Sequence, residues 1–230
     1  MARYARAHFD PDILVVNVVH NDFDESLCSV KREAGMLCLE YDGNAVHEPS
    51  IIPYEPNPVF RMARRINSIL YIVANLQISA RLDRLASRIR STPNYNANID
   101  VESVKTIRSR IETAVDYVLS TLKRESRGRP VVFIMDAPLK DIYANTLKQS
   151  DVRWLNELLQ HKTLQFGFVF IDLTDAFARI FESEHVRLDV QYDGHWNKRG
   201  HEAAAQALHT TLARHQLLTH LSASTARPSL

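Results

Sequence analysis

The sequence has almost no net charge and no long apolar run. Its 230 residues include 28 Lys and Arg against 27 Asp and Glu, a formal net charge of +1. This balance gives no electrostatic reason to expect a nucleic acid or an acidic substrate. No stretch approaches the roughly 20 apolar residues that a membrane helix needs, so we expect no membrane span. Residues 1–8 are basic but no apolar segment follows them, so we expect no export signal, and the compartment stays open.

Cysteine is also scarce. The only two, Cys28 and Cys38, lie ten positions apart, without the Cys-x-x-Cys spacing of redox and metal sites. This spacing favours two unpaired thiols in a reduced or redox-neutral setting over a disulfide framework. The 45% of hydrophobic residues is enough for a sizeable core, and the length fits one domain.

Three short segments predict strands that are buried on both faces. Residues 12–19, 131–135 and 167–173 are almost continuously apolar and rich in β-branched or aromatic side chains. Such runs are typical of a parallel sheet with helices on both sides. Apolar positions spaced three or four apart predict helices between and after them, at 59–76, 102–125, 153–160 and 200–212, besides an opening helix at 2–9. The alternation predicts an α/β protein, a three-layer α/β/α sandwich around a parallel sheet.

Other parts of the chain interrupt this alternation. Residues 28–58 predict an insertion, with a hairpin turn at Asp42-Gly43 followed by a loop that carries four prolines. Residues 92–100 predict a polar loop. We therefore expect a single domain over residues 1–221 and a disordered tail over residues 222–230.

Asn21 follows the first predicted strand directly. The carboxyl ends of parallel strands are where open α/β sheets bind their ligands. The side-chain amide of Asn21 is suited to donate to an oxyanion that develops during acyl transfer. The alternative is that Asn21 and Asp22 cap the following turn or helix, a role that suits both residue types.

Asp193 and His195 lie two positions apart in a predicted loop before the last helix. A carboxylate at this spacing can fix the tautomer of the imidazole and leave its other nitrogen free as a general base. A solvated turn is the alternative. His201 is expected to pack at the start of the helix. Asp193, His195 and His201 together match no common zinc spacing, so we expect no metal and no cofactor.

These elements together resemble the SGNH/GDSL hydrolase family. The resemblance is carried by Asp10-Pro-Asp12 before the first strand, Asn21-Asp-Phe23 after it, and Asp193-Gly-His-Trp-Asn197 with Gly200-His201 before the last helix. Residues 65–71 also resemble a helix of one subgroup, so the similarity spans about residues 4–213. It implies a flavodoxin-like fold and a serine esterase, with Asn21 in the oxyanion hole and Asp193 and His195 as the Asp and His of the catalytic triad.

The sequence departs from the family pattern at the nucleophile. The family carries a Gly-Asp-Ser segment and an oxyanion-hole glycine upstream of the strand that ends in Asn-Asp, and this sequence contains no Gly-Asp-Ser. Val19 also stands where the family often has glycine. Ser26 and Ser29 follow Asn21 closely, but nothing places either at a strained turn that faces His195. We expect that an N-terminal part with a central strand is absent, and that this chain alone is inactive.

Three functions follow as expectations. The first is hydrolysis of a small-molecule or glycan ester by the serine mechanism. The second is transfer of an acyl group to a glycan hydroxyl by the same residues, and the third is a non-catalytic binding domain of the same ancestry. Without a central strand, residues 12–19 become an apolar sheet edge, which predicts self-association.

Overall fold

The computed structural model describes residues 2–48, 53, 66, 95–190 and 194–218. Apart from residues 53 and 66, the proline-containing stretch 49–58 and the predicted helix at 59–76 lie outside the described residues, as does the predicted tail at 222–230. No helix in the described ranges combines the length and the apolar character needed to cross a membrane.

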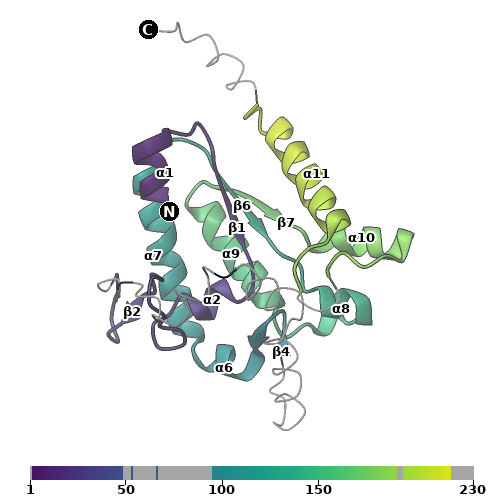
Figure 1. Ribbon diagram of the computed structural model, residues 1–230, viewed down its shortest axis with the longest axis horizontal. Coiled ribbons are helices and arrows are strands. Elements are labelled where there is room, and N and C mark those ends of the chain that lie inside the picture. Colours follow the sequence, from purple (N-terminus) through teal and green to yellow (C-terminus); the bar gives the residue numbers. More distant parts are fainter. Residues whose placement is uncertain (1, 49–52, 54–65, 67–94, 191–193, 219–230) are drawn as a thin grey trace, which may run out of the picture.

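A three-stranded parallel sheet forms the centre of the protein (Figure 1). Its strands are β1 (Leu14–Val18), β6 (Val131–Met135) and β7 (Val169–Asp172), in the order β1-β6-β7. In the register of the sheet, Val16 pairs with Phe133, which in turn pairs with Phe170. The predicted parallel sheet is therefore confirmed, with β6 at the predicted residues.

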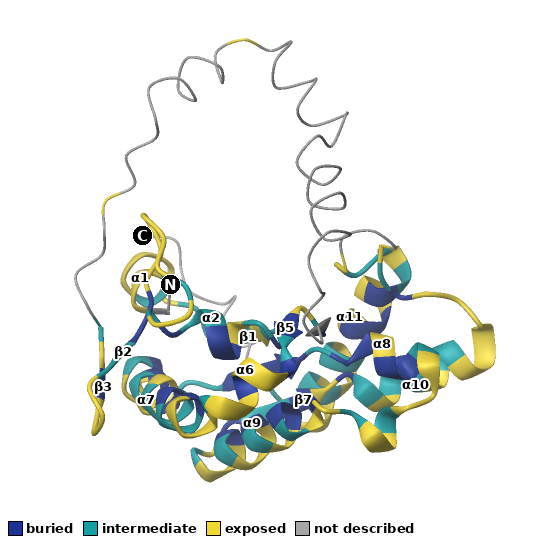
Figure 2. Cartoon of the chain, turned by 90° about the horizontal axis from the view of Figure 1, so that it is seen from below, coloured by how far each residue is buried: buried dark blue, intermediate teal, exposed yellow. Residues whose placement is uncertain are grey.

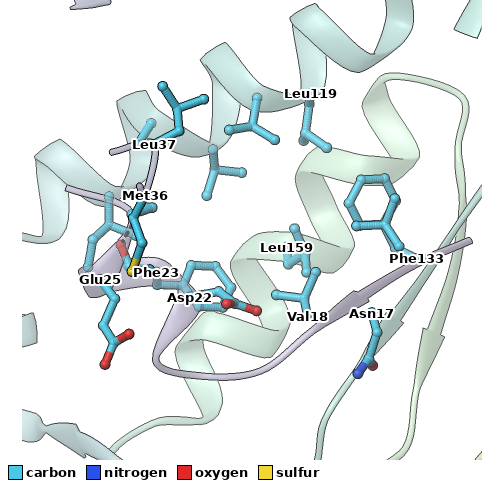
Figure 3. A pocket seen from close by; sticks show the side chains of 16 residues that line it. Asn17, Val18, Asp22, Phe23, Glu25, Met36, Leu37, Leu119, Phe133 and Leu159 are labelled. Carbon is cyan, nitrogen blue, oxygen red and sulfur yellow. Dashed lines mark hydrogen bonds between the residues drawn. The ribbon is translucent and has the colours of Figure 1, made fainter. Parts of the chain in front are cut away.

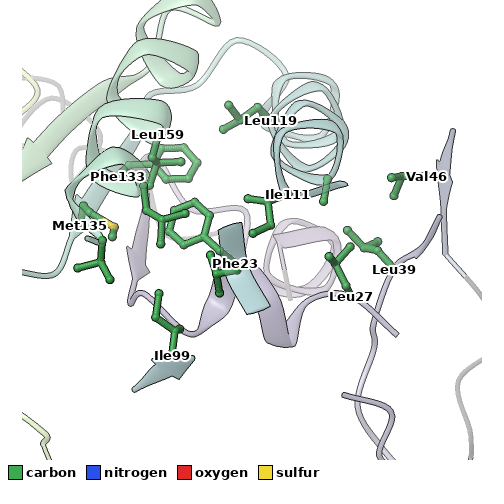
Figure 4. Packing of buried hydrophobic residues seen from close by; sticks show 14 of the residues in the cluster. Phe23, Leu27, Leu39, Val46, Ile99, Ile111, Leu119, Phe133, Met135 and Leu159 are labelled. Atoms are coloured by element: carbon green, nitrogen blue, oxygen red, sulfur yellow. The ribbon is translucent and has the colours of Figure 1, made fainter. Parts of the chain in front are cut away.

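Helices pack on both faces of this sheet, as Figures 1 and 2 show. Because successive strand residues point to opposite faces, Phe133 and Met135 lie in one apolar cluster, and Val132 and Ile134 in the other. Figure 4 shows Phe133 packed with Leu159 and Ile111 in the first cluster. The first cluster contains α6 (Val101–Thr106), α7 (Arg108–Ser126) and α9 (Arg153–Gln165), and the second α8 (Leu139–Ala144), α10 (Thr174–Glu184) and α11 (Lys198–Arg214).

The helices differ in detail from the prediction. The opening helix is present as α1 (Ala2–Phe9), and α9 and α11 extend beyond their predicted ends. The single helix predicted at 102–125 is two helices, α6 and α7, because the backbone leaves the helical region at Ile107, where φ is −102° and ψ is 15°. Helices α8 and α10 and a short 3₁₀ helix at Leu147–Gln149 were not predicted.

The prediction of a polar loop at 92–100 is wrong for its described part. Strands β4 (Tyr95–Asn96) and β5 (Ile99–Asp100) form a small antiparallel hairpin. Its two-residue turn has positive φ at both Ala97 and Asn98, 51° and 64°, as hairpin turns require. Ile99 is fully buried in the core, which anchors the hairpin beside the sheet.

The prediction of unpaired thiols is also wrong, because Cys28 and Cys38 form a disulfide with their Cα atoms 5.0 Å apart. The predicted hairpin turn is present between β2 (Glu40–Tyr41) and β3 (Val46–His47). Leu39 bonds back to the segment before it, since its N–H donates to Ser26 O and its carbonyl accepts from Cys28 N. This pairing brings the two cysteines together, which their spacing alone does not reveal.

Strand β1 lies at one edge of the sheet, with β6 as its only strand neighbour among the described residues. The N–H of Leu14 donates to Pro130 and the carbonyl of Val18 accepts from Asp136, so the backbone groups of Val15 and Asn17 point to the open edge. Val15 is 46% exposed. The prediction that all three strands are buried on both faces therefore holds throughout only for β6, whose five residues are all buried.

Removing the disulfide should destabilise the fold. A loop of this length contributes about 2–3 kcal/mol by restricting the unfolded chain. We expect the Cys28→Ala/Cys38→Ala variant to lose that amount of unfolding free energy in urea titrations. Alkylation of the unfolded wild-type chain should label two thiols after reduction and none before. Labelling without reductant would contradict the disulfide.

The open edge of β1 should cause self-association, because unpaired edge strands with apolar side chains pair with other chains. We expect sedimentation velocity to show association that rises with concentration and is reduced by Val15→Lys. The matched control is Val186→Lys, since Val186 is similarly exposed at 39% but lies after α10. A monomer at all concentrations, or equal effects of both variants, would contradict this role for the edge.

Candidate functional site

A cavity of about 510 Å³ opens at the carboxyl ends of β1 and β6. Residues that follow both strands line it, together with the β4–β5 turn, the loop before α11 and the start of α11. Asn21, His195 and His201 all border this cavity, although they are far apart in the sequence. Asp193 lies outside the described residues.

Asn21 stands at the N-cap position of α2 (Asp22–Glu25), but its side chain makes no capping hydrogen bond. Asp22 binds the turn instead, since its Oδ2 accepts from the N–H of Val19 at 2.8 Å. This bond closes the turn that precedes α2, so it is not a cap of the helix that follows. The Asn21 amide borders the cavity and has no hydrogen-bond partner among the described residues.

The loop that carries His195 is held by backbone bonds on both sides. The N–H of Val190 donates to the carbonyl of His195 at 2.7 Å, and Asn197 caps α11 by accepting from Gly200 N at 3.0 Å. Gly200 is required where it stands, because a Cβ there would clash with the carbonyl oxygen of Leu188. The loop backbone is thus fixed against the start of α11, while the His195 side chain is exposed.

Asp136 directly follows β6, and sequence reasoning missed it. Its Oδ1 accepts from the indole N–H of Trp196 at 2.7 Å and from Ala137 N at 2.8 Å. Burial raises the pKa of Asp136 to about 6, against the lowering effect of these two bonds. The bond to Trp196 joins the end of β6 to the loop that carries His195.

His20 and Asn156 are two further residues that the sequence did not reveal. His20 lies between β1 and Asn21, lines the cavity and is 1% exposed. Its Nε2 lies 2.9 Å from Oδ1 of Asn156, a buried residue of α9. Burial lowers the pKa of His20 to about 4. A polar residue at the very end of an apolar strand was the one local signal available for His20 and Asp136.

His201 contacts the ring of Trp196 edge-on, with the ring centroids 5.5 Å apart. This contact agrees with the packing role expected at the start of α11, and His201 also borders the cavity. Within the described ranges, no three His, Cys, Asp or Glu side chains are placed to hold a metal ion.

A second, more apolar cavity of about 410 Å³ lies between β1, α7 and α9 (Figure 3). Val18, Leu119 and Leu159 point into it, whereas the side chain of Asn17 points to the other side of β1. Ser26 lines this second cavity and donates to the carbonyl of Phe23 at 3.1 Å. The structure therefore places Ser26 away from the cavity that His195 borders.

The raised pKa of Asp136 predicts a pH dependence of stability. The folded protein binds this proton more tightly than the unfolded chain, so the stabilisation is complete below about pH 4 and is lost as the pH rises through 6. Two pKa units correspond to about 3 kcal/mol. Asp136→Asn removes this titration and keeps an oxygen acceptor for Trp196.

We therefore expect the unfolding free energy of Asp136→Asn, relative to wild type, to rise by about 3 kcal/mol between pH 4 and pH 8. Urea unfolding at both pH values measures this difference. As a complement, Trp196→Phe removes the donor to Oδ1 and should move the titration midpoint upwards. A difference between variant and wild type that does not change with pH would contradict the assignment.

Comparisons of this chain with protein-family models, with curated proteins and with solved structures give no match.

Proposed function

We propose that this chain carries the proton-accepting and oxyanion-binding part of a serine-type site that hydrolyses esters. The observation that supports this most is the convergence of Asn21 and His195 on one cavity at the carboxyl ends of parallel strands. Asn21 offers an amide donor that no described residue occupies. The flavodoxin-like SGNH fold of this proposal agrees with a parallel sheet packed by helices on both faces.

In this proposal each residue has one role. His195 accepts the proton of the attacking hydroxyl and later returns it to the leaving alcohol. Asp193 orients the imidazole and stabilises its charged form. The Nδ2–H of Asn21 donates to the oxygen of the carbonyl as it becomes an oxyanion in the tetrahedral intermediate.

The nucleophile has to come from elsewhere, because no described residue that lines this cavity carries a hydroxyl or a thiol. The open edge of β1 is the natural place for it. A further parallel strand added there would end at the same level as β1, beside Asn21. We propose that the serine stands at the end of such a strand.

The test is hydrolysis of p-nitrophenyl acetate by the protein as its native gene produces it, with the length established by intact mass. His195→Ala should lower kcat/KM by about a thousandfold or more. Asn21→Ala should lower kcat by about 10²–10³-fold with little change in KM.

The matched control is His161→Ala, an exposed histidine on α9 outside the cavity. It should leave the rate unchanged. Equal rates for wild type and His195→Ala would reject the esterase. The second candidate, a binding domain without catalysis, would then be preferred, since the described cavity residues lack a nucleophile.

A further inference from the structure

The orientation of the Asn156 side chain fixes the tautomer of His20. The Nδ2 of Asn156 lies 3.0 Å from the carbonyl oxygen of Asp136, 3.1 Å from Oδ1 of Asp172 and 3.4 Å from Oγ1 of Thr174. A carbonyl and a carboxylate only accept hydrogen bonds, so the amide nitrogen must face them. The amide oxygen therefore faces His20, and the proton of the imidazole lies on Nε2.

The second nitrogen of His20 is left with a lone pair. Nδ1 has no hydrogen-bond partner among the described residues, although the ring is 1% exposed. Burial holds the pKa of His20 at about 4, so the ring is neutral at physiological pH. An acceptor at a cavity wall that no protein group engages favours a ligand that donates a hydrogen bond to it.

We infer that His20 is a second ligand-contacting histidine of this cavity, and that its Nδ1 accepts a hydrogen bond from a free hydroxyl group of the substrate. That the ligand is an ester rests on the proposed function. The hydrogen bond to Nδ1 needs only binding and does not depend on catalysis.

The neighbouring side chains favour the same class of ligand. Asn17, Asn21 and Asn98 line the cavity, and no hydrogen bond engages their side-chain amides within the described part of the chain. Each amide both donates and accepts, as a hydroxyl does. Nδ1 of His20 only accepts, so it selects for a hydroxyl and against an ether or an ester oxygen at that position.

Two esters distinguish this hydrogen bond from apolar binding. Glycerol monoacetate and propyl acetate share the acetyl group and a three-carbon alcohol, and only the first carries free hydroxyls. The chain with ¹⁵N-labelled histidine should show His20 as the Nε2–H tautomer. Glycerol monoacetate should shift the Nδ1 resonance of His20, propyl acetate should not, and the dissociation constants should differ by about 3- to 10-fold.

Variants provide the second measurement. His20→Phe removes the acceptor but leaves the Asn156 oxygen unpaired, whereas His20→Phe/Asn156→Leu removes both polar partners and protects the fold. Both should abolish the preference for glycerol monoacetate. An Nδ1–H tautomer, equal affinity for the two esters, a preference that survives in the double variant, or no shift up to the solubility limit would overturn the inference.

The His195→Ala variant separates this inference from the proposed function. It should still bind glycerol monoacetate with the same shift at His20, because a general base is not needed for binding. If the His20 resonance shifts but the natural protein does not hydrolyse the ester, the proposed esterase function is rejected and the hydroxyl-binding role of His20 is supported. If the protein hydrolyses both esters with equal KM, the esterase function is supported and the hydroxyl-binding role of His20 is rejected.

Discussion

The buried amide of Asn156 joins the carboxyl ends of all three strands of the sheet. Its oxygen accepts from His20 after β1, and its nitrogen donates to the Asp136 carbonyl after β6 and to Asp172 at the end of β7. Because each buried polar group left unpaired costs about 1–3 kcal/mol, the three ends are fixed relative to one another. The walls of the larger cavity depend on this one side chain of α9.

Burial has opposite effects on the pKa values of the two titratable groups at these strand ends. It lowers that of His20 to about 4 and raises that of Asp136 to about 6, because in both cases the charged form loses its hydration. His20 is thereby kept as a neutral acceptor. Asp136 is ionised at neutral pH and holds Trp196, the neighbour of His195, by a strong hydrogen bond. The lowered pKa thus keeps His20 as an acceptor in the cavity. The ionised Asp136 holds the loop that carries His195.

The open edge of β1 connects stability with the proposed chemistry. The same strand leaves Val15 exposed, directs the backbone of Asn17 to the edge and ends beside Asn21. Pairing such an edge with another strand adds backbone hydrogen bonds and so stabilises the chain. The last residues of a strand that pairs there in parallel would lie at the cavity. The proposed strand would account both for the edge of β1 that is unpaired among the described residues and for the lack of a described nucleophile in the cavity.

The sequence by itself determined the parallel sheet, its β6 strand and the hairpin at Asp42-Gly43, because periodicity and turn residues are local signals. It also singled out Asn21 and His195, which the structure brings to one cavity, while Asp193 stays a prediction. Only the tertiary structure decided the Cys28–Cys38 disulfide and the network of Asn156. The disulfide and the Asn156 network each join residues from separate segments that only folding brings together. The spacing of residues along the sequence does not reveal such contacts.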